Sequence, residues 1–89
     1  MKLKNYRPRE MREVEYFGVK ISVPADTEWV ATDDNGEVIS YPIEPEEQHG
    51  IWVVPQQYEM QTALIGRFDP LDENDAIKTL RHYPIGDAA

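Results

Sequence analysis

The sequence predicts a small α+β domain: a four- to five-stranded, mostly antiparallel sheet with one C-terminal amphipathic helix on one face. Three observations support this prediction. Short apolar runs alternate with polar residues at the two-residue period of strands, turn residues separate these runs, and the clearest helical pattern comes near the end. The chain has 89 residues, which is enough for one domain with a small core.

The first strand is predicted over residues 19–23, where apolar and polar side chains alternate. Upstream, Val14 and Tyr16 alternate in the opposite phase. A change of phase beside a glycine is typical of a β-bulge, so a bulge is expected at Gly18. Pro24 ends the strand and begins a turn.

Residues 29–42 read WVATDDNGEVISYP and predict a β-hairpin. Asp33 at the first turn position and Gly36 at the fourth are typical of a type I turn closed by a left-handed glycine. A calcium loop of the EF-hand type would place Ala31 and Pro42 where the metal needs carboxylates, so that interpretation is excluded. The acidic turn is therefore expected to be structural.

This turn also sets the register of the predicted hairpin. The expected pairs are Ala31 with Ile39 and Trp29 with Tyr41 on one face, and Val30 with Ser40 and Thr32 with Val38 on the other. The first face is larger and more apolar, so we expect it to face the core.

The middle of the chain is less regular. Residues 43–50, IEPEEQHG, have no apolar period and predict a solvated loop, whereas the apolar run 51–54 predicts a buried strand. Residues 58–68 favour a strand with a bulge at Gly66, and a helix over 58–65 remains the alternative.

A helix of about ten residues is predicted after Leu71. Asp72 suits the N-cap, acidic residues occupy the first turn, and basic residues fall toward the end. The apolar stripe consists of Ala76, Ile77, Leu80 and Tyr83, and Pro84 ends the helix.

Charge divides the chain into a basic arm, residues 1–12, an acidic domain, residues 13–84, and a tail, residues 85–89. The arm carries five bases and one acid, a net charge of +4, and the rest carries four bases and sixteen acids, a net charge of −12. We expect the arm to be flexible or docked on the acidic body. An acidic body repels phosphate and anionic lipid, so direct nucleic-acid binding is expected only through the arm, and membrane binding is not expected.

No catalytic residues, cofactor or metal are predicted. The chain has no cysteine, and its two serines, Ser22 and Ser40, lie in predicted strands without a nucleophile-elbow pattern. His49 lies near several glutamates, but no second histidine stands at ligand spacing. The five glycines are scattered singly, which excludes a phosphate-binding loop. The sequence also lacks an apolar run of membrane-spanning length and a signal-peptide pattern, so a cytoplasmic location is expected.

One stretch, VPADTEWVATDDNGEVISYPIEP, resembles small orphan accessory proteins of tailed bacteriophages. The shared pattern is Val23-Pro24, Trp29 through Asp33, Asn35-Gly36, Val38 through Tyr41, Pro45 and Trp52. Asn35 departs from the pattern, where an acid is more usual, and the basic arm is not part of it. The resemblance implies a bacterial cytoplasm during infection and carries over no catalytic residues.

These observations favour a non-enzymatic phage-type accessory protein that binds a host protein with a basic surface, as an inhibitor or a nucleic-acid-mimicking decoy. The expected partner-binding residues are Asp33, Asp34, Glu37, Glu44, Glu46, Glu47 and the aromatic Trp52. One alternative is an assembly protein that forms a homo-oligomer through exposed strand edges. A weaker alternative is a small-ligand binding module.

Overall fold

The computed structural model describes residues 10–85, which form eight strands, one 3₁₀ helix and one α-helix. In chain order these are β1 (Met11–Tyr16), β2 (Val19–Pro24), β3 (Trp29–Thr32), β4 (Glu37–Tyr41), β5 (Glu46–Gln48), β6 (Ile51–Val53), η1 (Gln56–Gln61), β7 (Ala63–Arg67), α1 (Glu73–Ala76) and β8 (Arg81–His82). The prediction of antiparallel strands with a small helical content is confirmed. The strands are divided among three sheets, so the prediction of one sheet of four or five strands holds only for the central one.

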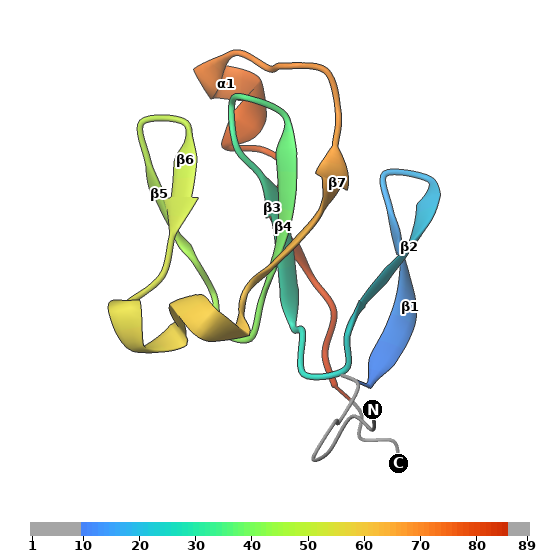
Figure 1. The fold of residues 1–89 in the computed structure, drawn as a ribbon. Coiled ribbons are helices and arrows are strands. Elements are labelled where there is room, and N and C mark those ends of the chain that lie inside the picture. The colour runs from blue at the N-terminus through green and yellow to red at the C-terminus, as the bar shows by residue number, and fades with distance from the viewer. Residues whose placement is uncertain (1–9, 86–89) are drawn as a thin grey trace, which may run out of the picture.

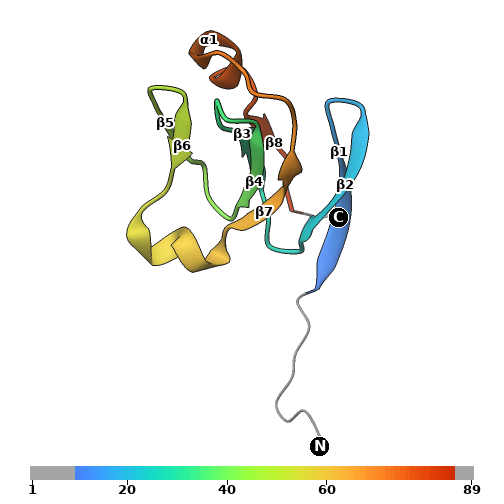
Figure 2. The ribbon, with the colours of Figure 1, turned by 45° about the horizontal axis from the view of Figure 1, so that its top comes forward.

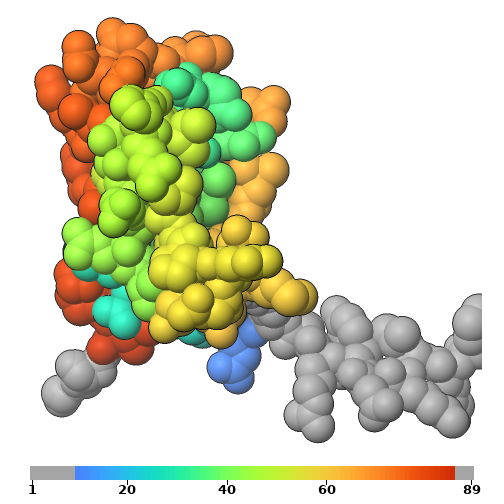
Figure 3. All heavy atoms as spheres, turned by 90° about the vertical axis from the view of Figure 1, so that its left-hand side faces the viewer, coloured from blue at the N-terminus to red at the C-terminus, as the bar shows by residue number. Residues whose placement is uncertain are grey.

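The central sheet has the strand order β7-β4-β3-β8, and all its pairings are antiparallel. The β1–β2 hairpin lies on one side of this sheet and the β5–β6 hairpin on the other (Figure 1). Turning the molecule shows β8 beside β3 (Figure 2). The β5–β6 hairpin and η1 together cover one side of the molecule (Figure 3).

The β3–β4 hairpin has the predicted register. Trp29 pairs with Tyr41, Val30 with Ser40, Ala31 with Ile39 and Thr32 with Val38. The amide of Gly36 donates to the carbonyl of Asp33 (2.9 Å), and Gly36 has a φ of 93°. The turn chemistry read from the sequence is therefore confirmed.

The expectation that only one face of this hairpin meets the core is wrong, because both faces are buried. Ala31 and Tyr41 pack with Trp52 of the β5–β6 hairpin. On the opposite face, Val30 and Val38 pack with side chains of the β1–β2 hairpin. Alternation along a central strand thus supplies two small cores, one on each side.

The predicted bulge beside Gly18 is instead a two-residue hairpin turn. Tyr16 pairs with Val19, and the intervening Phe17 and Gly18 have φ angles of 50° and 79°. Two consecutive positive φ angles are typical of the type I′ turn that joins short hairpins. The change of phase in the sequence marks the reversal of the chain.

The predicted solvated loop over residues 43–50 also contains a hairpin. The β5–β6 turn consists of His49 and Gly50, with φ angles of 53° and 86°. The Glu47 carboxylate accepts a hydrogen bond from the Gly50 amide (2.8 Å), which stabilises the turn. The strand predicted over 51–54 is confirmed as β6, but its predicted burial holds only for Trp52, because Ile51 is exposed and Val53 is half-buried.

Residues 58–68 contain both a helical segment and a strand. The 3₁₀ helix η1 ends at Gln61, and β7 begins at Ala63. The pairing of β7 with β4 shifts register between Gly66 and Leu64, which leaves Ile65 as the extra residue. The predicted irregularity at Gly66 is confirmed to within one residue.

The predicted ten-residue helix does not form. The Asp72 carboxylate accepts a hydrogen bond from the Asp75 amide (2.8 Å) as expected for an N-cap, but α1 ends after one turn at Ala76. Residues 81–82 instead pair with the free edge of β3 as β8. Pairing with an open strand edge satisfies backbone groups that a short surface helix would leave to water.

The last two residues of the predicted arm, Met11 and Arg12, belong to strand β1. Arg12 lies in β1, and its Nη2 donates to the carbonyls of Thr27 (2.6 Å) and Tyr83 (2.7 Å). Residues 1–9 of the predicted arm and residues 86–89 of the predicted tail lie outside the described residues. Within residues 10–85, no helix is long and apolar enough to cross a membrane.

A buried hydroxyl network connects β1, β3 and the segment after α1. The Thr32 amide donates to Thr79 Oγ1 (2.9 Å), and Thr79 Oγ1 donates to the carbonyl of Ala76 (2.7 Å). The Tyr16 hydroxyl lies 2.7 Å from Thr32 Oγ1 and donates to the carbonyl of Thr79 (3.0 Å). Burial raises the pKa of Tyr16, so the hydroxyl stays a donor.

Replacing Thr79 by valine tests this network, because the change keeps the shape and removes the hydroxyl. We expect Thr79→Val to lower the free energy of unfolding by about 1–3 kcal/mol, since the buried Thr32 amide loses its acceptor. The exposed hydrogen bond of Thr62 to Glu59 provides a control, and Thr62→Val is expected to cost less than about 0.5 kcal/mol. Urea denaturation measures both, and equal costs would contradict the network's role.

Candidate functional site

The acidic turn of the β3–β4 hairpin is built into the fold. Asp33 is buried, and its carboxylate accepts a hydrogen bond from the Trp52 amide (2.8 Å). Its own amide donates to the carbonyl of Glu37 (3.0 Å). Loss of hydration on burial raises the pKa of Asp33, and the Trp52 hydrogen bond opposes this by favouring the charged form. Asp33 therefore holds β6 against the sheet.

The same turn holds two other segments through backbone hydrogen bonds. The Asp34 amide donates to the carbonyl of Gly50 in the β5–β6 turn (2.8 Å). The Asp34 carbonyl accepts from the Leu71 amide, and the Gly36 carbonyl accepts from the Phe68 amide, each at 2.8 Å. The path of the chain from residue 68 to residue 71 is thereby fixed to this turn.

The predicted partner-binding residues do not form one free surface. Glu37 pairs with Arg67 (2.6 Å), and Glu47 accepts from the Gly50 amide. Only Glu44 and Glu46 of the predicted set are exposed.

The expectation that Trp52 offers an exposed aromatic contact is corrected by the structure. Trp52 is only 8% exposed, and its indole Nε1 donates to the carbonyl of Ala76 (3.3 Å). The ring fills the core between the central sheet and the β5–β6 hairpin, as an aromatic residue with a satisfied polar edge commonly does.

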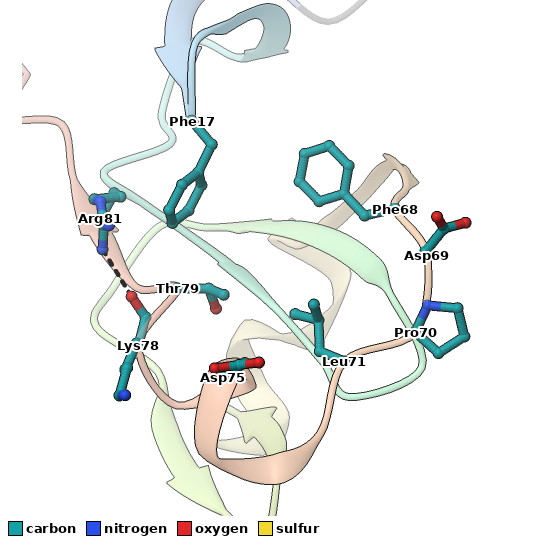
Figure 4. A pocket seen from close by; sticks show the side chains of 9 residues that line it. All are labelled: Phe17, Phe68, Asp69, Pro70, Leu71, Asp75, Lys78, Thr79 and Arg81. Carbon is teal, nitrogen blue, oxygen red and sulfur yellow. Dashed lines mark hydrogen bonds between the residues drawn. The ribbon is translucent and has the colours of Figure 1, made fainter.

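Within residues 10–85, the exposed phenylalanines are Phe17 and Phe68, and they face each other across a groove (Figure 4). The groove has a volume of about 600 Å³ and lies between the tip of the β1–β2 hairpin and the segment leading into α1. Its lining consists of Phe17, Phe68, Asp69, Pro70, Leu71, Asp75, Lys78, Thr79 and Arg81. We call it the Phe17–Phe68 groove.

The Phe17 side of the groove is locally strained. Phe17 has a φ of 50°, a left-handed conformation that costs a bulky residue roughly 1–2 kcal/mol. Phe17 is 51% exposed, although its ring meets the ring of Tyr16 edge-on at 4.8 Å between centroids. The Arg81 guanidinium lies 4.3 Å from the centre of the Phe17 ring, which stabilises the ring's position.

The Phe68 side is fixed by backbone contacts. A Cβ added at Gly36 would lie 2.1 Å from the Phe68 carbonyl oxygen, so only glycine permits this approach. The Phe68 ring stacks parallel to Tyr16 at 6.2 Å between centroids and is 38% exposed. Tyr16 therefore contacts both aromatic residues of the groove.

Charged groups surround the apolar surface. Arg81 Nη1 donates to the carbonyls of Lys78 and Leu80, each at 2.9 Å, so this guanidinium is held by the protein itself. Asp69 and Asp75 lie at the edge of the groove and are exposed (Figure 4). Within residues 10–85, neither carboxylate has an ion-pair partner.

The arrangement suits the binding of an apolar group. Two opposed aromatic rings and the side chains of Pro70 and Leu71 offer apolar contact, and the Thr79 hydroxyl is already engaged in the buried network. No group of three or more histidine, aspartate or glutamate side chains within residues 10–85 is arranged to hold a metal ion.

Reasoning from the sequence missed both aromatic residues of the groove. The signal was present at residues 17–18, because an aromatic residue directly before a glycine between two alternating runs marks a hairpin tip. Phe68 had no such signal, since its place depends on the backbone contact with Gly36, which is distant in sequence.

Comparison with known proteins adds no assignment. No protein-family model, no curated protein and no solved structure matches the chain.

The raised pKa of Asp33 predicts a pH dependence of stability. The folded state binds a proton more tightly than the unfolded state, so Asp33 lowers stability as pH rises from its unfolded value of 3.8 through its raised folded value. We expect Asp33→Asn, which keeps an acceptor for the Trp52 amide, to lose this contribution. The stability of the variant relative to wild type, from urea denaturation, should rise between pH 4 and pH 7. A stability difference between variant and wild type that stays constant over this pH range would contradict a raised pKa of Asp33.

Replacing Gly36 tests the contact that fixes Phe68. Gly36→Ala is expected to lower the free energy of unfolding by at least about 2 kcal/mol, because of the positive φ and the clash with the Phe68 carbonyl. Gly66 is the matched control, since an added Cβ there meets nothing within 4 Å. Gly66→Ala should change stability by less than about 1 kcal/mol. Similar losses for both variants would exclude the clash as the cause.

Proposed function

We propose that this protein is a non-enzymatic binding module that holds an apolar side chain of a protein partner in the Phe17–Phe68 groove. The observation that supports this most is the conformation of Phe17. A half-exposed aromatic ring stands on a hairpin turn where asparagine, aspartate or glycine would fit without strain.

The energy balance at Phe17 indicates that its ring serves binding more than it serves folding. The left-handed conformation costs roughly 1–2 kcal/mol. The exposed contact with Arg81 returns about 0.5–1 kcal/mol and the edge-on contact with Tyr16 about 0.5–1.5 kcal/mol, so the terms nearly cancel. The ring therefore adds little to stability, and strained residues of this kind concentrate at binding sites. A partner that covers the ring would recover the apolar area that the free protein leaves in water.

The open groove favours a protein partner over a small ligand. Small-ligand sites bury most of the ligand surface, but the lining residues Phe17, Phe68, Asp69 and Arg81 are all exposed. A side chain delivered by a larger surface needs only a shallow receptor, because surrounding contacts exclude water.

The resemblance to bacteriophage accessory proteins supports a bacterial host protein as the partner. We propose that binding inhibits or diverts that host protein. The predicted acidic residues Glu44 and Glu46 remain available as peripheral contacts, whereas Asp33, Glu37, Glu47 and Trp52 contribute mainly through the fold.

Phe17→Asn tests the proposal, because asparagine tolerates the left-handed turn. We expect stability to change by less than about 1 kcal/mol. Recovery of the partner from bacterial lysate should fall at least tenfold, which corresponds to about 1.4 kcal/mol of binding free energy. Affinity capture with mass spectrometry measures recovery, and urea denaturation measures stability.

Met60→Asn is the matched control for this experiment. Met60 is 93% exposed on η1 and does not line the groove, so its replacement removes apolar surface elsewhere. Partner recovery should be unchanged. Full recovery by Phe17→Asn would refute the groove, and recovery of only untagged copies of the protein itself would favour the homo-oligomer alternative.

A further inference from the structure

We infer, resting on the proposed function, that the segment bound in the Phe17–Phe68 groove is basic: an apolar or aromatic side chain flanked by lysine or arginine. The groove supplies the apolar contact, and the charges around it select the flanking residues.

The overall charge of the described residues favours a cationic partner. Residues 10–85 contain sixteen acids and five bases, a net charge of −11. A field of this size attracts basic segments from solution and raises their association rate, and salt weakens it.

The charges at the groove favour the same partner. Asp69 and Asp75 lie at its edge without ion-pair partners inside the described structure, and Asp72 and Glu73 lie next to them on exposed positions of the same segment. A lysine or arginine beside the bound apolar group would lie within reach of these carboxylates.

The cations of the groove are less available to an anionic partner. Arg81 is stacked on Phe17 and bound to two backbone carbonyls, and the Lys78 side chain points away from the two aromatic rings (Figure 4). An acidic flanking residue would lie near Asp69 or Asp75, whose charges no ion pair within residues 10–85 offsets. Like charges at an interface oppose binding, so the arrangement selects against acidic segments.

The chain itself contains a segment of this chemistry, since residues 1–9 carry four bases together with Leu3 and Tyr6. In the same molecule, β1 runs about 20 Å from Met11 to the hairpin tip at the usual rise of a strand. From Met11 back to Tyr6 the chain spans only about 18 Å even when extended, so Tyr6 does not reach the groove along β1. Since the arm's aromatic residue cannot reach the groove in this way, a foreign segment is the occupant we infer. Leu3, whose extended chain spans about 29 Å from Met11, makes the arm an outcome that the experiment separates.

Titration of the full-length, ¹⁵N-labelled protein with three pentapeptides tests the inference. The probes are Lys-Lys-Phe-Lys-Lys, Lys-Lys-Ala-Lys-Lys and Glu-Glu-Phe-Glu-Glu at low ionic strength. We expect the first to shift the amide signals of Phe17, Phe68 and Leu71 and to bind at least tenfold more tightly than either other peptide. Raising the salt concentration to 0.5 M should remove most of that advantage, because the Debye length falls below 5 Å.

Two double variants test whether the carboxylates at the groove, rather than the overall charge, attract the basic peptide. Asp69→Asn with Asp75→Asn should weaken binding of Lys-Lys-Phe-Lys-Lys at least fivefold. Glu44→Gln with Glu46→Gln changes the net charge equally at a distance from the groove and should weaken binding less than twofold. Equal losses in the two would show that only the overall charge matters and would overturn the local assignment.

The outcomes separate the inference from the proposed function. Equal binding of Lys-Lys-Phe-Lys-Lys and Glu-Glu-Phe-Glu-Glu would overturn the basic partner while the groove stands. If Phe17→Asn binds the basic peptide as tightly as wild type, the proposed function itself fails. A full-length variant with Leu3 and Tyr6 replaced by asparagine, which keeps the net charge, gives the third outcome. If it binds the peptide more than tenfold more tightly than wild type, the occupant is the protein's own arm, and the foreign segment is overturned.

Discussion

The tight turn from Asp33 to Gly36 is the constraint on which the rest of the structure depends, because two segments distant in sequence, the β5–β6 hairpin and residues 68–71, complete their hydrogen bonds on it. Through the Asp33 carboxylate it binds the Trp52 amide, and through backbone groups it binds the β5–β6 turn and residues 68–71. A chain of this size buries only about 60% of its unfolded surface, so few other contacts tie these segments together. The conformation of one turn thus sets the position of β6 and of one side of the groove.

The burial of Asp33 in this turn lowers the stability of the folded state. Burying a carboxylate opposes folding at neutral pH, and the raised pKa of Asp33 expresses that opposition. An amide donor at 2.8 Å offsets part of it. The second network, built from Tyr16, Thr32 and Thr79, uses neutral groups and avoids the cost of a charge. The two networks lie next to each other along β3, since Thr32 and Asp33 are neighbours in sequence.

What the sequence predicts well is local. The register of the β3–β4 hairpin follows from a glycine four positions after the start of a turn, and the cap at Asp72 follows from side-chain chemistry within three residues. What it misses depends on distant partners. Residues 81–82 carry a helical pattern, yet they pair with the open edge of β3. The apolar face with Trp29 was correctly placed inside, but nothing local reveals that Tyr16 and Val23 cover the other face. The acidic residues suggested a surface, and long-range contacts assign several of them to the fold.

Long-range contacts also give the Phe17–Phe68 groove a definite shape in so small a protein. Phe17 is held by its turn, by the edge of Tyr16 and by Arg81, whereas Phe68 is held by the Gly36 carbonyl and the face of Tyr16. Each ring therefore has its own support on the central sheet, and Tyr16 contacts both. Because these contacts lie within the protein itself, the two rings already lie apart in the free state. A partner therefore does not need to order them on binding. Preorganisation of this kind raises affinity by lowering the entropy lost on association, which lets a shallow groove with two exposed rings act as a receptor.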